Sequence, residues 1–251
     1  MKIRGAQMPA RIIVNGAQGK MGILACETLD NHPDFQLVAA LGRGDHLQNA
    51  IIDNKADIVV DLTRADCAYE NSLTIINNGA HPVIGTSGLI DEQIQHLVLL
   101  SAEKKLGGII VPNFSISAVL MMQFAAQAAA YLTEVEIIEA HHQQKLDAPS
   151  GTALKTAEMI AAARRGKKNQ LVLKELVPGA RGGLHHDINI HSLCLPGILA
   201  RQQIIFGSKG ETLTITHDSI DRASFMPGLV LACQGVQQLK TLYYGLEHLL
   251  Y

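Results

Sequence analysis

The sequence predicts an α/β protein in which a doubly wound parallel sheet carries an inserted α+β domain. Two observations lead to this fold class. Short β-rich runs alternate with helical stretches over residues 11–114, which is typical of a parallel sheet with helices on both faces. After residue 114 the pattern changes to a long helical run and then to strands separated by tight turns, which favours a second, α+β unit.

The first part contains the elements of a Rossmann-like domain. The runs rich in Val and Ile that we expect to form strands are residues 11–16, 35–41, 57–63, 81–86 and 107–114. Apolar residues recur at helical spacing between them, in residues 20–30, 65–78 and 91–106. Strand and helix therefore alternate as a nucleotide-binding sheet requires.

The second part mixes helices and strands. Helices are expected at 115–132 and 150–164, and strands at 135–142, 187–195, 200–206 and 211–217, the last two forming an antiparallel hairpin. Residues 224–250 have helical apolar spacing, and we expect them to pack back onto the first domain. The predicted domains are therefore 1–114 with 220–251 for dinucleotide binding, and 115–219 for substrate binding.

Composition favours small-molecule chemistry. The net charge of −2 provides no basic field for nucleic acid, and no apolar run approaches the length of a membrane span. The N-terminal segment lacks the apolar core of a secretory signal. The Cys residues are scattered without close pairs, which fits a reducing cytoplasm.

A glycine-rich loop follows the first predicted strand and precedes a helix. It consists of Gly16, Ala17, Gln18, Gly19, Lys20 and Met21, with Gly22 beyond. In the first strand-to-helix turn of such a sheet, glycines let backbone amides approach a pyrophosphate at the helix N-terminus. The alternative is a turn that only packs helix against strand, but its position favours a nicotinamide dinucleotide.

The end of the second predicted strand bears on the choice of cofactor. An NAD site usually places a carboxylate there to accept the ribose hydroxyls, yet this strand ends in Gly42 and Arg43. Arg43 and Lys20 could together face a 2′-phosphate, while nearby Asp45 keeps NAD open. The cofactor is therefore expected to be NADPH or NADH.

Residues 139–153, EAHHQQKLDAPSGTA, combine an acid/base candidate, a cation and an anion site. His141 or His142 can donate a proton near neutral pH, and on a strand the two would point to opposite faces. Lys145 can donate a proton or bind a carboxylate. The amides of Gly151 and Thr152 at the start of the next helix could bind a substrate carboxylate.

Metal binding is not expected from the sequence. The adjacent histidines of residues 141–142 would diverge on a strand, and His185, His186, His191 and His217 offer no pair at helical i, i+4 spacing.

The segment EAHHQQKLDAPSGTA resembles the hallmark of the dihydrodipicolinate reductase family. The motifs VNGAQGKMG (14–22), DLT (61–63), IGTSG (84–88), PNFSIS (112–117), IHSLCLPG (190–197), IIFGSKGETLTITHDS (204–219) and FMPGLVLA (225–232) are similar in the same order. The resemblance covers nearly the whole chain. It implies reduction of a cyclic dicarboxylate by NADH or NADPH in lysine and diaminopimelate biosynthesis, and a homotetramer assembled through the inserted domain.

The resemblance also implies roles for individual residues. His141 matches the acid/base histidine, Lys145 the proton-donating lysine and His142 a substrate contact, while Gly151 and Thr152 match the carboxylate-binding pair. The positions implied to bind cofactor are Gly16 through Met21, then Gly85, Thr86 and Ser87 near the nicotinamide ribose, and Val111, Pro112, Asn113 and Phe114 beside the nicotinamide.

Two positions depart from the family pattern. Gly42 stands where many members carry an acidic residue, and Lys20 where an Arg is frequent, so cofactor preference is left open. Two other functions are weighed: a reductase of another imine or amino dicarboxylate, similar to aspartate dehydrogenase, and a non-catalytic NAD(P)-sensing regulator. The His141–Lys145 segment argues against both.

Overall fold

The computed structural model describes residues 8–165 and 174–250, and it divides into two compact units. Unit 1 comprises Met1–Ser115 and Phe225–Tyr251, and unit 2 comprises Ile116–Ser224. The first seven residues of the N-terminal segment, which was not expected to be a secretory signal, lie outside the described residues.

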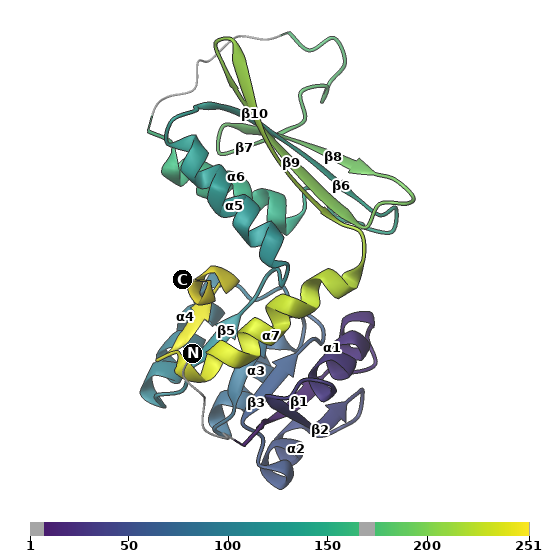
Figure 1. Cartoon of the computed structure of the whole chain (residues 1–251), viewed down its shortest axis with the longest axis vertical. Helices are drawn as coiled ribbons and strands as arrows, with labels where there is room; N and C mark the ends of the chain where they lie inside the picture. Colours follow the sequence, from purple (N-terminus) through teal and green to yellow (C-terminus); the bar gives the residue numbers. More distant parts are fainter. Residues whose placement is uncertain (1–7, 166–173, 251) are drawn as a thin grey trace. The chain divides into compact units, whose positions relative to one another are not determined.

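Unit 1 is built on a six-stranded parallel sheet in the order β11-β5-β4-β3-β1-β2 (Figure 1). Its strands are β1 (Ala10–Asn15), β2 (Phe35–Leu41), β3 (Ile58–Asp61), β4 (His81–Ile84), β5 (Gly108–Ile110) and β11 (Leu242–Tyr244). The central strand β3 is buried along its whole length, because helices cover both faces of the sheet. The fold class predicted from the sequence is confirmed.

Two layers of helices cover this sheet. Helix α1 (Lys20–Asp30) packs beside α7 (Met226–Gly235), whereas α2 (Leu47–Asn54), α3 (Ala68–Asn77) and α4 (Asp91–Glu103) form a row. Right-handed crossovers from β1 to β2 and from β2 to β3 run in opposite directions, so they place α1 and α2 on opposite faces. Because strands β1 to β5 are parallel, their carboxyl ends lie at the same edge of the sheet, and the glycine loop begins there.

The structure differs from the sequence prediction at two places in unit 1. Helix α2 was not predicted, because only one of its eight residues, Ile51, is buried and its apolar pattern is weak. The closing segment was predicted helical to residue 250, which is wrong beyond α7. There the chain forms 3-10 turns at Val236–Gln238 and Leu246–Leu249 around strand β11, since periodicity cannot separate a short apolar strand from a helix.

Unit 2 is a five-stranded mixed sheet, ordered β10-β9-β6-β8-β7, with helices α5 (Ile116–Ala129) and α6 (Gly151–Ala163) packed on it (Figure 1). The strands are β6 (Glu134–His141), β7 (Gly183–His185), β8 (Ile188–Cys194), β9 (Ala200–Ser208) and β10 (Glu211–Ser219). The predicted hairpin is the β9–β10 pair, whereas the three-residue β7 was missed.

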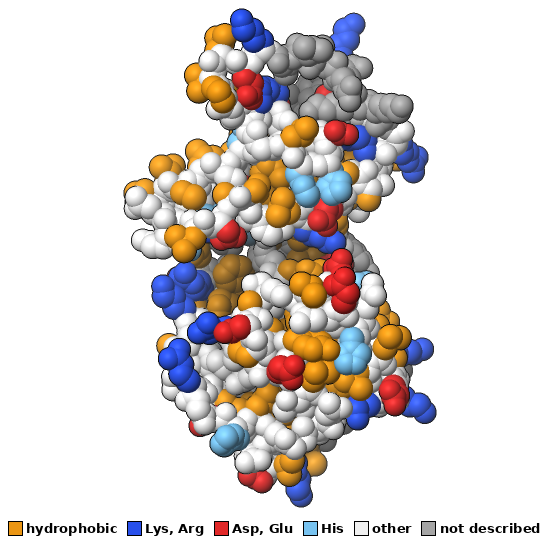
Figure 2. Space-filling model, turned by 180° about the vertical axis from the view of Figure 1, so that it is seen from behind, with side chains coloured by type: hydrophobic (Ala, Val, Ile, Leu, Met, Phe, Trp, Pro, Cys, Tyr) orange, Lys and Arg blue, Asp and Glu red, His pale blue; other side chains and the backbone are white. Residues whose placement is uncertain are grey.

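None of the helices in the described ranges is both long enough and apolar enough to cross a bilayer. On the face of unit 1 visible in Figure 2, acidic and basic side chains are interspersed with apolar ones.

Candidate active site

The glycine loop after β1 is a close-packed turn. Gly16 has a φ of +89°, and a Cβ there would lie 2.6 Å from the carbonyl oxygen of Leu62. A Cβ on Gly22 would lie 2.1 Å from the carbonyl oxygen of Gly16. Both positions therefore require glycine, the first for its backbone conformation and the second for the contact between helix and loop.

The N-terminus of α1 lies directly after this loop. Gly19 is the N-cap, and no side chain caps this end of the helix. The first-turn amides, including those of Lys20 and Met21, therefore have neither an intrahelical partner nor a side-chain cap. The side chains of Gln18 and Lys20 are exposed at the same place. Loop and helix together fit the pyrophosphate of a dinucleotide, which the positive end of a helix dipole attracts.

The end of β2 has its own local order. A Cβ on Gly42 would lie 2.5 Å from the side-chain nitrogen of Gln18, so this amide packs over the glycine. The amide of Gly42 donates to an Asp45 carboxylate oxygen at 2.7 Å. The Asp45 carboxylate, which could have bound the ribose hydroxyls of NAD, therefore has one oxygen hydrogen-bonded to the loop backbone. The Arg43 side chain is exposed.

A third cluster forms where β4 and β5 end. A Cβ on Gly85 would lie 2.5 Å from the Phe114 ring and 2.7 Å from the Leu62 side chain, so two expected cofactor positions meet here. Phe114 and Val111 are buried. Pro112 and Ser87 are exposed, and the Asn113 side chain accepts a hydrogen bond from the Ser115 amide at 2.8 Å.

A buried carboxylate lies beneath these loops. Asp61, at the end of β3, is fully buried and accepts hydrogen bonds from Asn15 at 2.9 Å, Thr63 at 2.9 Å and Asn71 at 3.2 Å. The Thr86 hydroxyl donates to the backbone oxygen of Asp61 at 3.2 Å. Burial raises the pKa of Asp61 to about 6, although the side-chain hydrogen bonds act in the opposite direction. Asp61 connects the residue before the glycine loop with the loop of Thr86.

In unit 2, His141 is paired with a buried glutamate. Glu139 and His141 are two residues apart on β6 and so share a face. His141 Nδ1 lies 2.8 Å from Oε2 of Glu139, whose side chain is only 2% exposed. Burial alone would raise the pKa of Glu139, but hydrogen bonds from His141, Ser192 and Ser150 outweigh it and lower that pKa to about 2. A carboxylate that is ionised at neutral pH therefore faces His141.

Lys145 and His142 lie on the loop that follows. The Lys145 Nζ is 2.6 Å from the exposed carboxylate of Asp147. The hydrogen bond from Lys145, and more weakly the charge of His141, hold the pKa of Asp147 below its usual value. His142 lies beyond the end of β6, so the strand does not extend far enough to set the two histidines on opposite faces.

The loop ends at the N-terminus of α6. Ser150 is its N-cap, and its side-chain oxygen accepts the Ala153 amide at 3.2 Å. The Ser150 amide in turn donates to Glu139 at 3.2 Å, which ties the helix start to the strand that carries His141. Gly151 is exposed, and a Cβ there would meet nothing within 4 Å. The amides of Gly151 and Thr152 lie at the positive end of the helix dipole, where a carboxylate binds well.

The predicted site residues thus form two groups, one in each unit. The cofactor candidates lie at the strand-end edge of unit 1, and the acid/base and anion-binding candidates lie on the β6–α6 connection of unit 2. Sequence reasoning assigned no role to Glu139 or Asp61. The i, i+2 spacing of Glu139 and His141 on a strand could have revealed the first, whereas the contacts of Asp61 depend on the tertiary structure.

Comparison with known proteins matches both units. Residues 10–114 match the family described as "Dihydrodipicolinate reductase, N-terminus", and residues 117–250 match "Dihydrodipicolinate reductase, C-terminus". The 4-hydroxy-tetrahydrodipicolinate reductase of Legionella pneumophila (strain Lens) is 70% identical over 97% of this chain and 100% of its own length. That of Coxiella burnetii (strain Dugway 5J108-111) is 49% identical over the same shares.

A solved structure is also similar. The dipicolinate-bound dihydrodipicolinate reductase from Paenisporosarcina sp. TG-14 is 44% identical, with a TM-score of 0.88 over 97% of this chain and 100% of that one. The family matches together span both units, and the two full-length relatives are 70% and 49% identical. This chain therefore belongs to the dihydrodipicolinate reductase family.

Proposed function

We propose that the chain catalyses the NAD(P)H-dependent reduction of 4-hydroxy-tetrahydrodipicolinate to tetrahydrodipicolinate, with loss of water, in lysine and diaminopimelate biosynthesis. The names of its full-length relatives support this reaction. The observation that carries it within the chain is the β6–α6 connection, which joins the Glu139–His141 pair, Lys145 and the N-terminus of α6 in one segment. The substrate class is a small cyclic dicarboxylate.

The residues of unit 2 supply what the substrate needs. When bound, the nicotinamide supplies the hydride. Loss of water removes the substrate hydroxyl together with a proton of the neighbouring carbon, so it consumes no net proton. The conjugated imine then takes up one hydride and one proton, and we assign the delivery of this one proton to His141 and Lys145 acting together. The carboxylate of Glu139, 2.8 Å from Nδ1, orients the His141 ring. The amides of Gly151 and Thr152, with His142, bind the substrate carboxylates.

The residues of unit 1 fit the dinucleotide. We assign the pyrophosphate to Gly16 through Met21. The nicotinamide half of the cofactor is assigned to Gly85 to Ser87 and to Val111 to Phe114, two segments that meet where Gly85 packs against the Phe114 ring. The side chains of Arg43 and Lys20 are assigned to the 2′-phosphate of NADPH, whereas Lys20 contributes its backbone amide to the pyrophosphate. Residues 1–114 with 220–251 are then the dinucleotide-binding domain, and residues 115–219 the substrate-binding domain.

The direct test is an assay with substrate generated enzymatically from aspartate semialdehyde and pyruvate. The His141→Gln and Lys145→Ala variants should each lose about two or more orders of magnitude in turnover number, the scale expected when a positioned acid is lost. Thermal stability should hardly change, and NADPH should still bind in the absence of substrate. The double variant should lose less than the product of the two single losses, because groups acting in one step are not additive.

Other outcomes would favour the alternatives. Activity on aspartate or another imine, with none on this substrate, would indicate the aspartate dehydrogenase-like reductase. NADPH binding without turnover of any substrate would indicate a sensing regulator. Near-normal turnover in both single variants would remove His141 and Lys145 from the mechanism.

We also propose that unit 2 assembles the chain into a homotetramer in the cytoplasm. Helices α5 and α6 contact the second sheet, yet its edge strand β10 is mostly exposed, including Leu213, which is 41% exposed. Exposed apolar side chains on an uncovered edge are typical of subunit interfaces. Light scattering should give a mass about four times the 27.0 kDa of the chain. The four free cysteines fit a reducing compartment.

A further inference from the structure

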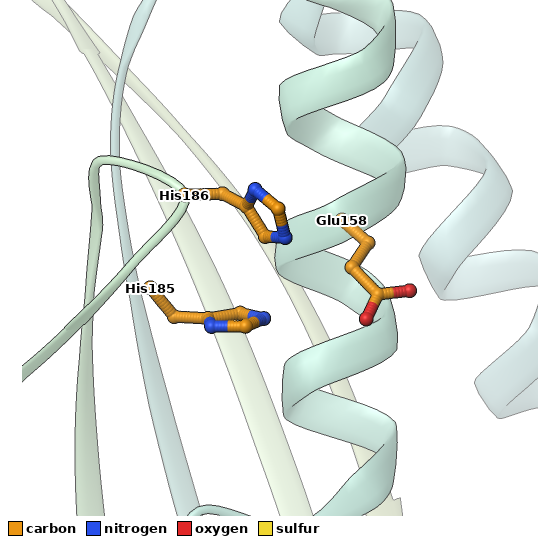
Figure 3. Close-up of side chains that lie close together, drawn as sticks. All are labelled: Glu158, His185 and His186. Atoms are coloured by element: carbon orange, nitrogen blue, oxygen red, sulfur yellow. The ribbon is translucent and has the colours of Figure 1, made fainter. Parts of the chain in front are cut away.

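Three side chains that play no part in the proposed reaction converge on the outside of unit 2. Glu158 comes from α6, and His185 and His186 come from the turn between β7 and β8 (Figure 3). One potential ligand atom from each lies within 4.8 Å of the others. Figure 3 shows both imidazole rings directed toward the helix face that carries Glu158.

The backbone of the turn explains how adjacent histidines can face the same way. His185 is the last residue of β7 and pairs with Ile188, so His186 and Asp187 form a two-residue hairpin loop. Their φ values of 48° and 60° lie in the left-handed region, as this kind of loop requires. Successive side chains of a strand would diverge, but the left-handed turn brings the rings together with centroids 4.4 Å apart.

The polar atoms of this cluster are incompletely satisfied. Nε2 of His185 is buried and has no hydrogen-bond partner among the described residues. Within residues 8–165 and 174–250, the carboxylate of Glu158 makes a single ion pair, a long one of 3.6 Å to Nζ of Lys155 one turn earlier on the helix. A buried imidazole nitrogen without a partner is costly unless something binds it, and a cation held by the carboxylate could do so.

We propose that Glu158, His185 and His186 form a binding site for a zinc-class divalent transition-metal ion. Two imidazole nitrogens and one carboxylate oxygen are a known ligand set for Zn²⁺, whereas Ca²⁺ and Mg²⁺ prefer oxygen ligands throughout. Tetrahedral Zn²⁺ holds such atoms about 3.3 Å apart, so atoms within 4.8 Å of one another must approach by at most about 1.5 Å. Side-chain rotation of the exposed Glu158 and His186 can supply this movement. The fourth position is left to water.

The metal site is separate from the substrate-binding residues and stabilises the unit that carries them. Glu158 lies two turns along α6 from Gly151, about 10 Å at the helical rise of 1.5 Å per residue. The ion would connect α6 to the β7–β8 hairpin, which contributes only the three-residue strand β7 to the sheet edge. Its expected effect is therefore on the stability of unit 2.

The test is zinc binding by the full-length protein, measured by competition with a chromophoric chelator after treatment with EDTA. The wild-type chain should bind one Zn²⁺ at this site. His186→Ala and Glu158→Gln should each weaken that binding at least about tenfold, since loss of even an outer-shell partner costs a metal site this much. Zn²⁺ should raise the Tm of the wild-type chain but not of these variants. Co²⁺ should give the visible absorption of a tetrahedral site.

Two matched controls separate a built site from surface binding. Lys155→Ala removes the cation that competes for Glu158 and should bind Zn²⁺ at least as tightly as the wild type. His96→Ala removes an exposed histidine from unit 1 and should change nothing. Equal binding by all variants, weakening by His96→Ala as large as by His186→Ala, or loss of binding in His142→Gln instead, would overturn the proposal. The reductase assay of each variant reports separately on the proposed function.

Discussion

At the scale of single residues, Glu139 determines the electrostatic environment of His141. A buried carboxylate whose pKa is lowered by hydrogen bonds to about 2 is ionised at neutral pH. It lies 2.8 Å from Nδ1 of His141, and it also accepts a hydrogen bond from the Ser150 amide at the start of α6. Glu139 is thus a positioning residue for both the proton donor and the anion site.

Replacing this carboxylate should lower turnover without weakening cofactor binding. Glu139→Gln removes the negative charge that faces His141 but keeps an amide oxygen in its place. The turnover number should decrease by about tenfold or more, yet by less than in His141→Gln. The measurement is kcat together with the KM for NADPH, which should not change.

A matched control lies on the same strand. Glu136 pairs with His191 at 2.8 Å, so Glu136→Gln also breaks a glutamate–histidine pair but away from the proposed site. Its kcat should equal that of the wild type. If the two Gln variants behaved alike, Glu139 would have a structural role only.

Arg43 is the residue on which cofactor preference should depend. Its guanidinium is exposed beside Gly42, and the nearby Asp45 carboxylate is engaged with the loop backbone. A charge-assisted contact to a 2′-phosphate contributes about 1.5–3 kcal/mol, so Arg43→Ala should raise the KM for NADPH about tenfold or more. The KM for NADH should hardly move.

Lys104→Ala, which removes an exposed cation at the end of α4, serves as the charge control and should leave both constants unchanged. Equal increases for NADH and NADPH in Arg43→Ala, or none, would mean that Arg43 does not read the 2′-phosphate.

At the scale of elements, the N-terminus of α6 can be tested with little damage to the fold. Gly151 is the first helical residue, a position that accepts proline, and Ser150 before it already has the extended conformation that a following proline requires. A Cβ at Gly151 meets no neighbour. Gly151→Pro therefore deletes one backbone donor while keeping the helix start.

This variant should raise the substrate KM about tenfold, because a hydrogen bond to a carboxylate contributes about 1.5–3 kcal/mol. Cofactor affinity and Tm should be unchanged. Thr152→Val, which deletes only a hydroxyl, should have a smaller effect on the same constant. A primary loss of NADPH affinity in Gly151→Pro would place the anion site elsewhere.

At the scale of the whole molecule, two buried carboxylates affect stability in opposite directions. Glu139 has a lowered pKa, so it stabilises the folded chain above its usual range near 4.5, and this contribution is lost as the pH falls toward about 2. Asp61 has a pKa raised from 3.8 to about 6, so between these values the folded chain binds more protons than the unfolded chain. Its contribution to the unfolding free energy therefore decreases as the pH rises from about 4 to 6.

The Asp61→Asn variant isolates this second effect. The Tm of the wild type minus that of Asp61→Asn should fall as the pH rises from 4 to 6.5, and should level off above it, because only the wild type has a buried carboxyl that ionises in this window. Differential scanning calorimetry at several pH values measures it. A constant difference across the window would show that Asp61 titrates like an exposed carboxyl.

Much of this protein could be predicted from the sequence by itself. The alternation of Val- and Ile-rich runs with amphipathic helices predicted the parallel sheet, and β2 and α1 have the bounds expected for them. The glycine loop was located because a buried strand followed by closely spaced glycines demands a tight turn. The residues 139–153 indicated acid/base and anion-binding chemistry because their types are rare together on one short loop. These features are local, and local sequence encodes them.

Only the tertiary structure decided which distant residues meet. Strand β11 completes the first sheet through pairing with β5, a partner far away in the chain. Asp61 gathers donors from three other segments of unit 1, and its raised pKa comes from burial that no spacing in the sequence encodes. Glu158 meets His185 and His186 only because a left-handed turn directs both rings toward α6. Periodicity reports the local conformation of a segment, whereas these contacts depend on how separate segments pack.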